Sequence, residues 1–239
     1  MFRNEGIDLK VRESAGSVQN YQEILKPGGD VDLAIVQGGT MPNDDEVPKK
    51  LQGIASLFVE PVWVFYRDAG TLDYLSQLAG KRVAVDVQGS GTRALAVKLL
   101  EADGAGSAIL DPSAGSDAAA ALKAGKVDAA IFVSAPKDPV IRRLIATDGI
   151  KLMNFSQAQG LERNFPYLSV VTLYRGSMDL AHNLPASDVT LVAPAAMLVA
   201  RAQSHKALVL LGAVAAEQTN SGGTLLNDPH AFPTTKYMD

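Results

Sequence analysis

Residues Lys81–Gly104 read KRVAVDVQGSGTRALAVKLLEADG, and this stretch decides the fold class. The β-branched run Val83–Val87 predicts a buried strand, and Gly89–Thr92 is a glycine-rich turn. Arg93–Asp103 is rich in alanine and leucine and predicts a helix, which ends at Gly104. A strand, a tight turn and a helix in this order are typical of α/β proteins.

The glycine-rich turn predicts one half of an anion-binding pocket. The first N–H groups of a helix have no partner within the helix, and the helix dipole favours an anion at that end. Ser90 and Thr92 add hydroxyl donors beside Gly91, and the guanidinium of Arg93 suits a carboxylate. The alternative is an ordinary turn in which Thr92 caps the helix and Arg93 lies in water. The stretch matches neither the P-loop nor the dinucleotide-binding pattern.

Composition excludes several classes of function. The chain has 239 residues, 47% of them hydrophobic and 20% charged, which leaves room for one large domain or two smaller ones. A formal charge of −4 gives no basic surface, so nucleic acid is not an expected partner. The absence of cysteine excludes disulfides and thiol catalysis, and the three scattered histidines predict no metal site. Neither a membrane-spanning run nor a signal peptide is evident.

Two segments of the chain share one plan, in which Ala-Gly-Ser opens a helix, a glycine ends it and a strand follows. Gly29–Ile35 and Gly125–Ile131 match at five of seven positions. Many α/β proteins reuse this plan, but the spacing of the two segments favours two similar lobes. The matched Asp32 and Asp128 are expected to be structural. Ahead of the first unit, the alternation in Ile7–Val11 predicts a strand.

Apolar runs predict the connections between the lobes. Leu57–Arg67 reads LFVEPVWVFYR, and its proline favours an edge or crossover segment whose aromatic residues belong to the core. Within it, Glu60 is either a solvated charge or an acceptor for the ammonium group of a ligand. Tyr167–Tyr174 is the predicted return crossover. Val189–Ala200 is expected to form two strand pieces because Pro194 interrupts it.

The order of these segments resembles a known family, the solute-binding proteins of tripartite ATP-independent periplasmic (TRAP) transporters in their TAXI branch. The resemblance covers Ile7–Glu217 and rests on DVDLAIVQGG, the aromatic run ending in Arg67, LAGKRVAVDVQGSGTRALAVKLL, GKVDAAIF and DVTLVAPAAMLVAR. It implies the type II periplasmic-binding-protein fold, an α/β fold of two lobes with two crossover segments. With the paired units, it predicts one lobe of residues 1–62 and 176–239 and a second lobe of residues 66–172.

The resemblance also implies a site and a function. A small solute, such as a carboxylate or an amino acid, is expected between the strand-end loops of the two lobes. The candidate ligand-binding residues are Ser17, Gln37, Gly38, Gly39, Glu60, Ser90, Gly91, Thr92, Arg93 and Ser134. Ser17 is alternatively only a helix N-cap, and residues 37–40 only a turn. No catalytic residue, cofactor or metal ion is expected.

The chain departs from this family at both ends. It lacks the signal peptide and first strand of its relatives, and it stops before the membrane segment that some of them carry, so it is expected to be truncated at both ends. The full-length protein is expected to be periplasmic or membrane-anchored outside the cytoplasm, and to work with membrane transporter subunits. The sheet edge left by the first strand predicts a homodimer, a swapped element or poor solubility.

Two other functions stay open. The first is a cytoplasmic ligand sensor of the same fold, which the lack of a signal peptide favours and the lack of a DNA-binding helix pair opposes. The second is an enzyme on this fold. No Ser/His/Asp order, metal cluster or carboxylate pair in the sequence supports an enzyme.

Overall fold

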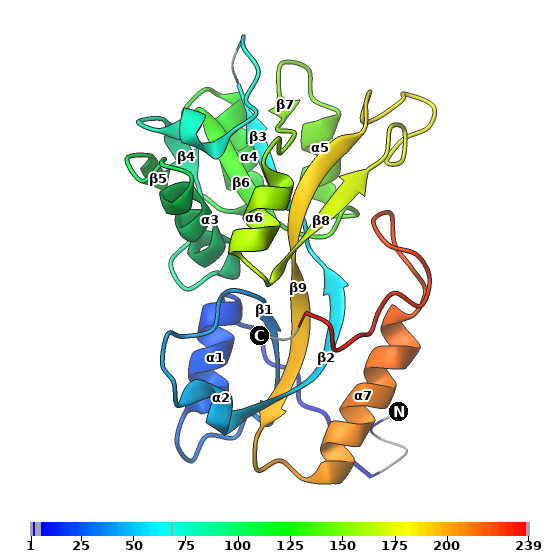
Figure 1. The fold of residues 1–239 in the computed structure, drawn as a ribbon. Coiled ribbons are helices and arrows are strands. Elements are labelled where there is room, and N and C mark those ends of the chain that lie inside the picture. Colours follow the sequence, from blue (N-terminus) through cyan, green and yellow to red (C-terminus); the bar gives the residue numbers. More distant parts are fainter. Residues whose placement is uncertain (1, 3–5, 68, 238–239) are drawn as a thin grey trace.

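The computed structural model describes residues 2, 6–67 and 69–237, which form two lobes joined by long strands at the centre (Figure 1). The lower lobe in Figure 1 contains the first and the last helices of the chain, and the middle of the chain forms the upper lobe. Each lobe is built on its own β-sheet. Two places in the chain therefore connect the lobes.

The sheet of the lower lobe is organised around β9 (Val189–Arg201), a strand that runs through both lobes (Figure 1) and pairs antiparallel with three strands. The second half of β9 lies between β1 (Leu33–Gln37) and β2 (Leu51–Val59). Its first half pairs with β8 (Leu168–Leu173). The helices of this lobe are α1 (Ser17–Leu25), α2 (Val47–Lys50) and α7 (Lys206–Asn220).

β9 is a single strand of 13 residues, so the expectation of two strand pieces is wrong. Pro194 pairs with Leu168 at the end of the β8 ladder, and the ladders with β2 and β1 begin at Ala195 and Ala196. Proline has no N–H to donate to a ladder. Here it stands where one ladder ends and the others begin, and the strand continues through it from one lobe into the other.

The upper lobe holds a five-stranded sheet with helices around it. Its strands are β3 (Val62–Tyr66), β4 (Arg82–Ala84), β5 (Ile109–Asp111), β6 (Ala129–Val133) and β7 (Lys151–Leu152). Its helices are the 3₁₀-helix η2 (Leu75–Leu78), α3 (Gly91–Ala102), α4 (Gly115–Lys123), α5 (Pro139–Ile145) and α6 (Ala158–Asn164). The strand order is β5-β4-β6-β3-β7, in which β4 runs parallel to β5 and β6 and antiparallel pairs join β3 to β6 and β7.

The predicted strand, turn and helix of Lys81–Gly104 form β4, a turn and α3 in the expected order, but β4 ends at Ala84 rather than at Val87, because the chain turns sharply at Asp86 with a φ of 75°. The strand predicted at Ile7–Val11 is absent, which makes that expectation wrong. An alternating pattern forms a strand only against a partner, and among the described strands β1 pairs with β9 alone. Arg12, directly after this segment, forms an ion pair with Asp30 in the loop before β1.

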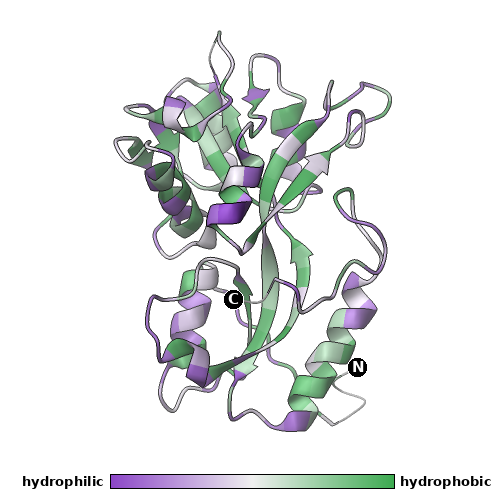
Figure 2. Ribbon diagram, viewed as in Figure 1, coloured by the Kyte–Doolittle hydropathy of each residue, from purple (hydrophilic) through white to green (hydrophobic). Residues whose placement is uncertain are grey.

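The core lies on the sheets, where Figure 2 shows apolar residues along the central strands. The aromatic run after Glu60 is core as predicted, with Trp63 and Phe65 fully buried and their rings stacked at 6.4 Å between centroids. Both packing and hydrogen bonding fix this segment, because the indole N–H of Trp63 donates to the carbonyl of Ser134 at 2.9 Å. None of the helices in the described residues is both long and apolar enough to cross a membrane.

Candidate functional site

The two lobes touch where the N-terminus of α1 meets the N-terminus of α3 (Figure 1). A Cβ atom added at Gly16 would lie 3.3 Å from the backbone nitrogen of Gly91 and 3.4 Å from the Cα of Ser90. On the Gly91 side, an added Cβ would lie 2.8 Å from Oε1 of Gln37 and 3.2 Å from Oγ of Ser17. The structure therefore brings four predicted site residues together, and two glycines permit the close approach.

Ser17 forms a hydrogen bond within the lower lobe at this contact. Its Oγ accepts a hydrogen bond from the backbone N–H of Gln37 at 2.9 Å, which ties the start of α1 to the end of β1. The N-cap of α1 is Gly16, so Ser17 is not that cap. The hydroxyl remains at the lobe interface, where its own proton can be donated to an acceptor.

Ser90, rather than Thr92, is the N-cap of α3. The Oγ of Ser90 accepts a hydrogen bond from the backbone N–H of Arg93 at 3.1 Å, and the residue is buried. The interpretation in which Thr92 caps the helix is therefore wrong. Because an α-helix leaves its first N–H groups without partners in the helix, Gly91 and Thr92 present such donors at the interface.

The side chain of Gln37 has an unsatisfied donor at this place. Gln37 is 5% exposed, and its Nε2 is buried without a hydrogen-bond partner. A buried polar group without a partner costs about 1–3 kcal/mol. Its amide oxygen faces Gly91, so the amide belongs to the same interface as the first turn of α3. The donors gathered here are suited to an acceptor, such as a carboxylate.

Arg93 is half-buried on the first turn of α3. Its Nη1 donates to the backbone carbonyl of Asp86 at 3.2 Å, in the loop after β4. Asp86 has a positive φ of 75°, which turns the chain sharply there. A guanidinium has five N–H donors, so this bond leaves donors for a ligand. The role of Arg93 as an anion clamp stays a prediction.

Glu60 and Ser134 lie at the passage from β2 to β3. The backbone N–H of Glu60 donates to the carbonyl of Pro194 at 3.0 Å, and that of Ser134 to the carbonyl of Pro61 at 3.4 Å. Burial raises the pKa of the Glu60 carboxyl to about 7. The hydroxyl of Ser134 donates to the carboxylate of Asp138 at 2.8 Å, and that carboxylate caps α5. Ser134 thus has a local structural role whatever it does toward a ligand.

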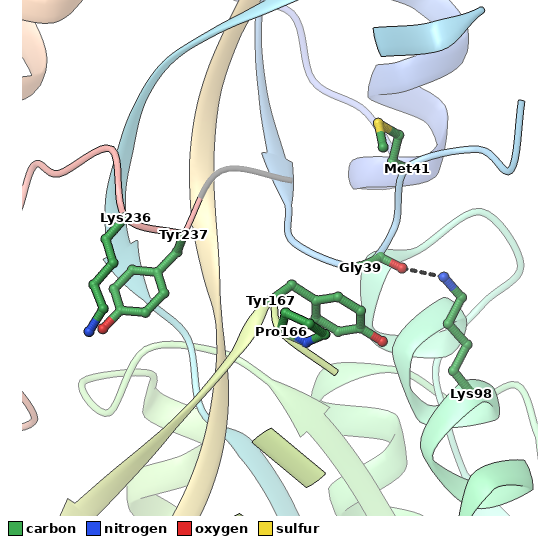
Figure 3. Close-up of a pocket in the computed structure, with 7 residues that line it drawn as sticks. All are labelled: Gly39, Met41, Lys98, Pro166, Tyr167, Lys236 and Tyr237. Atoms are coloured by element: carbon green, nitrogen blue, oxygen red, sulfur yellow. Dashed lines mark hydrogen bonds between the residues drawn. The ribbon is translucent and has the colours of Figure 1, made fainter. Parts of the chain in front are cut away.

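Gly39 lines a pocket of about 440 Å³ beside this contact (Figure 3), and Gly38 packs against Tyr167, which lines the same pocket. Gly39 has a φ of +79°, and an added Cβ would lie 2.3 Å from a ring carbon of Tyr167. The ammonium of Lys98 donates to the carbonyl of Gly39. The residues that line the pocket are Gly39, Met41, Lys98, Pro166, Tyr167, Lys236 and Tyr237.

Of these pocket residues, sequence reasoning identified only Gly39. One signal was present for Lys98, which follows Gly91 by seven residues and therefore lies two turns along the same face of α3. Tyr167 and the C-terminal segment gave no such signal. Within the described part of the chain, no group of three or more His, Asp and Glu side chains is placed to hold a metal ion.

Comparison with known proteins places the chain in a family. The model of the NMT1-like family matches residues 1–211. No curated protein sequence is similar enough to match the chain.

Solved structures show the same fold at low sequence identity. An ancestral arginine-binding protein bound to arginine is 15% identical, with a TM-score of 0.54, and the match covers 93% of this chain and 79% of that one. The periplasmic aliphatic sulphonate binding protein SsuA from Escherichia coli is 15% identical with a TM-score of 0.54, over 92% of this chain and 65% of that one. Holo ArgBP from T. maritima is 15% identical with a TM-score of 0.50, over 91% and 75%. The chain has the two-lobed type II periplasmic-binding-protein fold with its two crossover segments, which confirms the predicted fold class.

Proposed function

The chain belongs to the NMT1-like family, and from that premise we propose that it is an extracytoplasmic solute-binding protein. It captures a small carboxylate or amino acid between its lobes and performs no chemistry on it. The solved structures named above are binding proteins rather than enzymes, which supports this choice. The lobes close on the solute, and a membrane transporter recognises this closed form.

The observation that carries the proposal is the buried amide of Gln37 beside the first turn of α3. Its Nε2 has no partner, and Gly91, whose N–H belongs to the unpaired first turn of α3, lies at the same interface. A carboxylate oxygen placed there accepts from the amide and from the helix end, and the helix dipole favours its charge. Among the described residues, those named at this contact offer several donors and no carboxylate, so the contact favours an anionic group.

The ammonium group of an amino-acid solute fits the carboxyl of Glu60. This group is largely buried at the passage between the lobes, and burial alone raises its pKa. A buried carboxylate gains most from a cationic partner, and the ammonium of an amino acid is such a partner. We therefore assign the carboxylate of the solute to the α3 end and its ammonium to Glu60.

The transporter partner is proposed on the order of the sequence motifs. That order resembles the TAXI branch of TRAP-type solute-binding proteins, so we propose a TRAP-type membrane transporter as the partner and a periplasmic or membrane-anchored location outside the cytoplasm. We also propose that lobe I, which begins with residues 1–62, and lobe II, which begins at residue 66, are the two bodies that close on the solute, with the return passage at Pro194 of β9 rather than between residues 172 and 176. A second copy of the chain is proposed to pair along the edge of β1 to which no other described strand is bonded.

Isothermal titration calorimetry with the twenty amino acids and a set of small carboxylates tests the solute. Gln37→Leu removes the unsatisfied donor at similar volume, and we expect unchanged or higher stability with affinity weaker by about ten- to a hundredfold. Gln52→Leu is the matched control, because the Nε2 of Gln52 already donates to the carbonyl of Arg201 at 2.9 Å. This control should lose stability and keep its affinity.

Arg93 gives an independent test of the same site. Arg93→Ala should weaken carboxylate binding by about ten- to a hundredfold, and Arg93→Lys should recover only part of it, since an ammonium cannot make the two-pronged contact. Arg163→Ala, on the exposed end of α6, is the control. Full affinity in both the Gln37 and Arg93 variants would place the solute elsewhere and overturn the proposal.

A further inference from the structure

The pocket beside Gly39 is built from three separate parts of the chain (Figure 3). The loop after β1 contributes Gly39 and Met41, and the upper lobe contributes Lys98 and Tyr167. The C-terminal segment closes a third side with Lys236 and Tyr237. Its volume of about 440 Å³ falls in the usual range for small-molecule sites.

The C-terminal wall of the pocket is anchored in the fold. Thr234 forms an antiparallel bridge with Ser56 of β2, with backbone N···O distances of 2.7 and 3.0 Å. Phe232 is buried in the core that β3, β8 and β9 share, and its ring stacks on that of Tyr237 at 6.0 Å between centroids. The segment therefore holds Lys236 and Tyr237 in place at the pocket.

Both charged residues that line the pocket are cations. Lys98 and Lys236 stand toward opposite ends of the view in Figure 3, and no carboxylate occurs among the described lining residues. An ammonium has three N–H donors, and Lys98 donates one of them to the neutral carbonyl of Gly39. The Nζ of Lys236 lies 4.9 Å from the centroid of the Tyr237 ring. Lys236 forms no ion pair with any of the described residues.

The middle of the pocket between these two cations is apolar. In Figure 3, Pro166 and the rings of Tyr167 and Tyr237 lie between the two lysines, and Met41 lies above them. Such walls favour a hydrocarbon or ring surface. The lining is therefore complementary to a ligand that has a negative charge at each end and an apolar hydrocarbon segment between the charges.

We propose that this pocket binds an organic dianion with an apolar middle, such as a medium-length α,ω-dicarboxylate. One carboxylate meets Lys98 and the other meets Lys236, while the chain between them packs on the two tyrosine rings. The ligand touches both lobes and the C-terminal segment, so its binding favours the closed arrangement. This site is separate from the α3 N-terminus and does not depend on the solute proposed above.

Calorimetric titration of the purified protein with adipate and suberate tests the site. We expect binding of these dianions at about pH 7 that hexanoate and 1,6-hexanediol do not reproduce. Lys98→Met and Lys236→Met should each weaken it by about tenfold, because each removes one charge-assisted contact. Lys137→Met, an exposed lysine away from the pocket, is the matched control and should leave it unchanged.

The outcomes separate this inference from the proposed function. Binding of hexanoate as tight as that of adipate, or equal losses in the Lys137 and Lys98 variants, would overturn the dianion site. If amino acids bind and depend on Gln37 while the dianions do not bind, this inference fails alone. If the dianions bind and depend on both lysines while no solute depends on Gln37, the inference stands and the proposed function fails.

Discussion

The matching units Gly29–Ile35 and Gly125–Ile131 have nearly the same sequence but different surroundings. The second unit leads into β6, which lies between β4 and β3, and its Ile131 is 3% exposed. The first unit leads into β1, which pairs with β9 alone among the described strands, and the corresponding Ile35 is 51% exposed. Local sequence therefore determines that both segments become strands, and the neighbouring strands determine which of the two is buried.

The two strands, β6 and β1, also differ in what hydrogen-bonds to the backbone groups along their second edge. β6 is bonded there by the backbone of β4. β1 receives side chains of α1 instead, because Ser17 accepts from the N–H of Gln37 and the amide of Asn20 donates to the carbonyl of Ile35 at 2.7 Å. The lower lobe thus uses side chains where the upper lobe uses a strand.

The largest expected effect is the loss of packing at the buried unit. Ile131→Ala should lower the free energy of unfolding by about 3 kcal/mol, within the usual range for a buried aliphatic side chain. Ile35→Ala should change it by less than about 0.5 kcal/mol, as is usual for exposed positions. Urea denaturation of both variants measures the two changes. Equal losses at the two positions would show that Ile35 is buried in solution.

The junction between the lobes carries the next effect. Burial raises the pKa of Glu60 from its ordinary value of 4.5 to about 7, so between these pH values the folded protein holds a proton that the unfolded chain releases. Stability should therefore fall as pH rises through this window, by about 3 kcal/mol in the absence of ligand.

Glu60→Gln should remove this pH dependence and be the more stable protein at pH 8. Thermal unfolding between pH 4 and 8 measures the difference, with Glu217→Gln on the exposed side of α7 as the control. A Glu60 variant with the same pH profile as the parent would assign the dependence to other groups. In the ligand-bound protein the sign reverses, since an ammonium partner stabilises the charged carboxylate and amino-acid affinity should fall as pH drops below about 7.

The matched aspartates of the two units, Asp32 and Asp128, are expected to differ in their contribution to stability by a smaller amount. The carboxylate of Asp128 accepts from the backbone N–H of Arg82 at 2.8 Å and pairs with its guanidinium at 3.7 Å, which fixes β4 beside β6. Asp32 is exposed, and its backbone carbonyl accepts from Arg201. Asp128→Ala should cost about 1 kcal/mol and Asp32→Ala less than half of that. Chemical denaturation resolves this difference, and a larger loss at Asp32 would contradict the structural role given to Asp128.

Much of the fold could be predicted because the local signals agree with the final structure. The stretch Lys81–Gly104 contains its own strand, turn and helix stop. The wrong expectations concern strands whose state depends on partners. Ile7–Val11 has the alternation of a strand and no ladder to join, and β9 continues through Pro194 because its neighbours change there.

The candidate site was predictable in part for the same reason. Ser17, Gln37, Ser90 and Gly91 stand at strand ends or helix starts, where α/β folds gather ligand groups. The pocket could not be predicted, because it depends on where the C-terminal segment crosses β2 and on Tyr167 lying against Gly39. No periodicity or motif in the sequence records such contacts between distant segments.

The smallest expected effect concerns the edge of β1. Its Ile35 is exposed, and an open edge with an apolar side chain favours pairing with a second chain. Asn20 opposes this by occupying the carbonyl of Ile35. We therefore expect weak dimerisation that Asn20→Ala strengthens and Ile35→Lys weakens, each by about three- to tenfold in the dissociation constant.

Sedimentation velocity over a wide range of protein concentration measures this dimerisation. Leu210→Lys is the matched control, since it removes another exposed apolar side chain, on α7, and leaves the edge of β1 intact. If the Leu210 and Ile35 variants weaken association equally, the contact is apolar adhesion rather than strand pairing. If the parent stays monomeric at high concentration and Asn20→Ala changes nothing, the side chains of α1 are not what protects the edge, and the contrast with β6 reduces to burial alone.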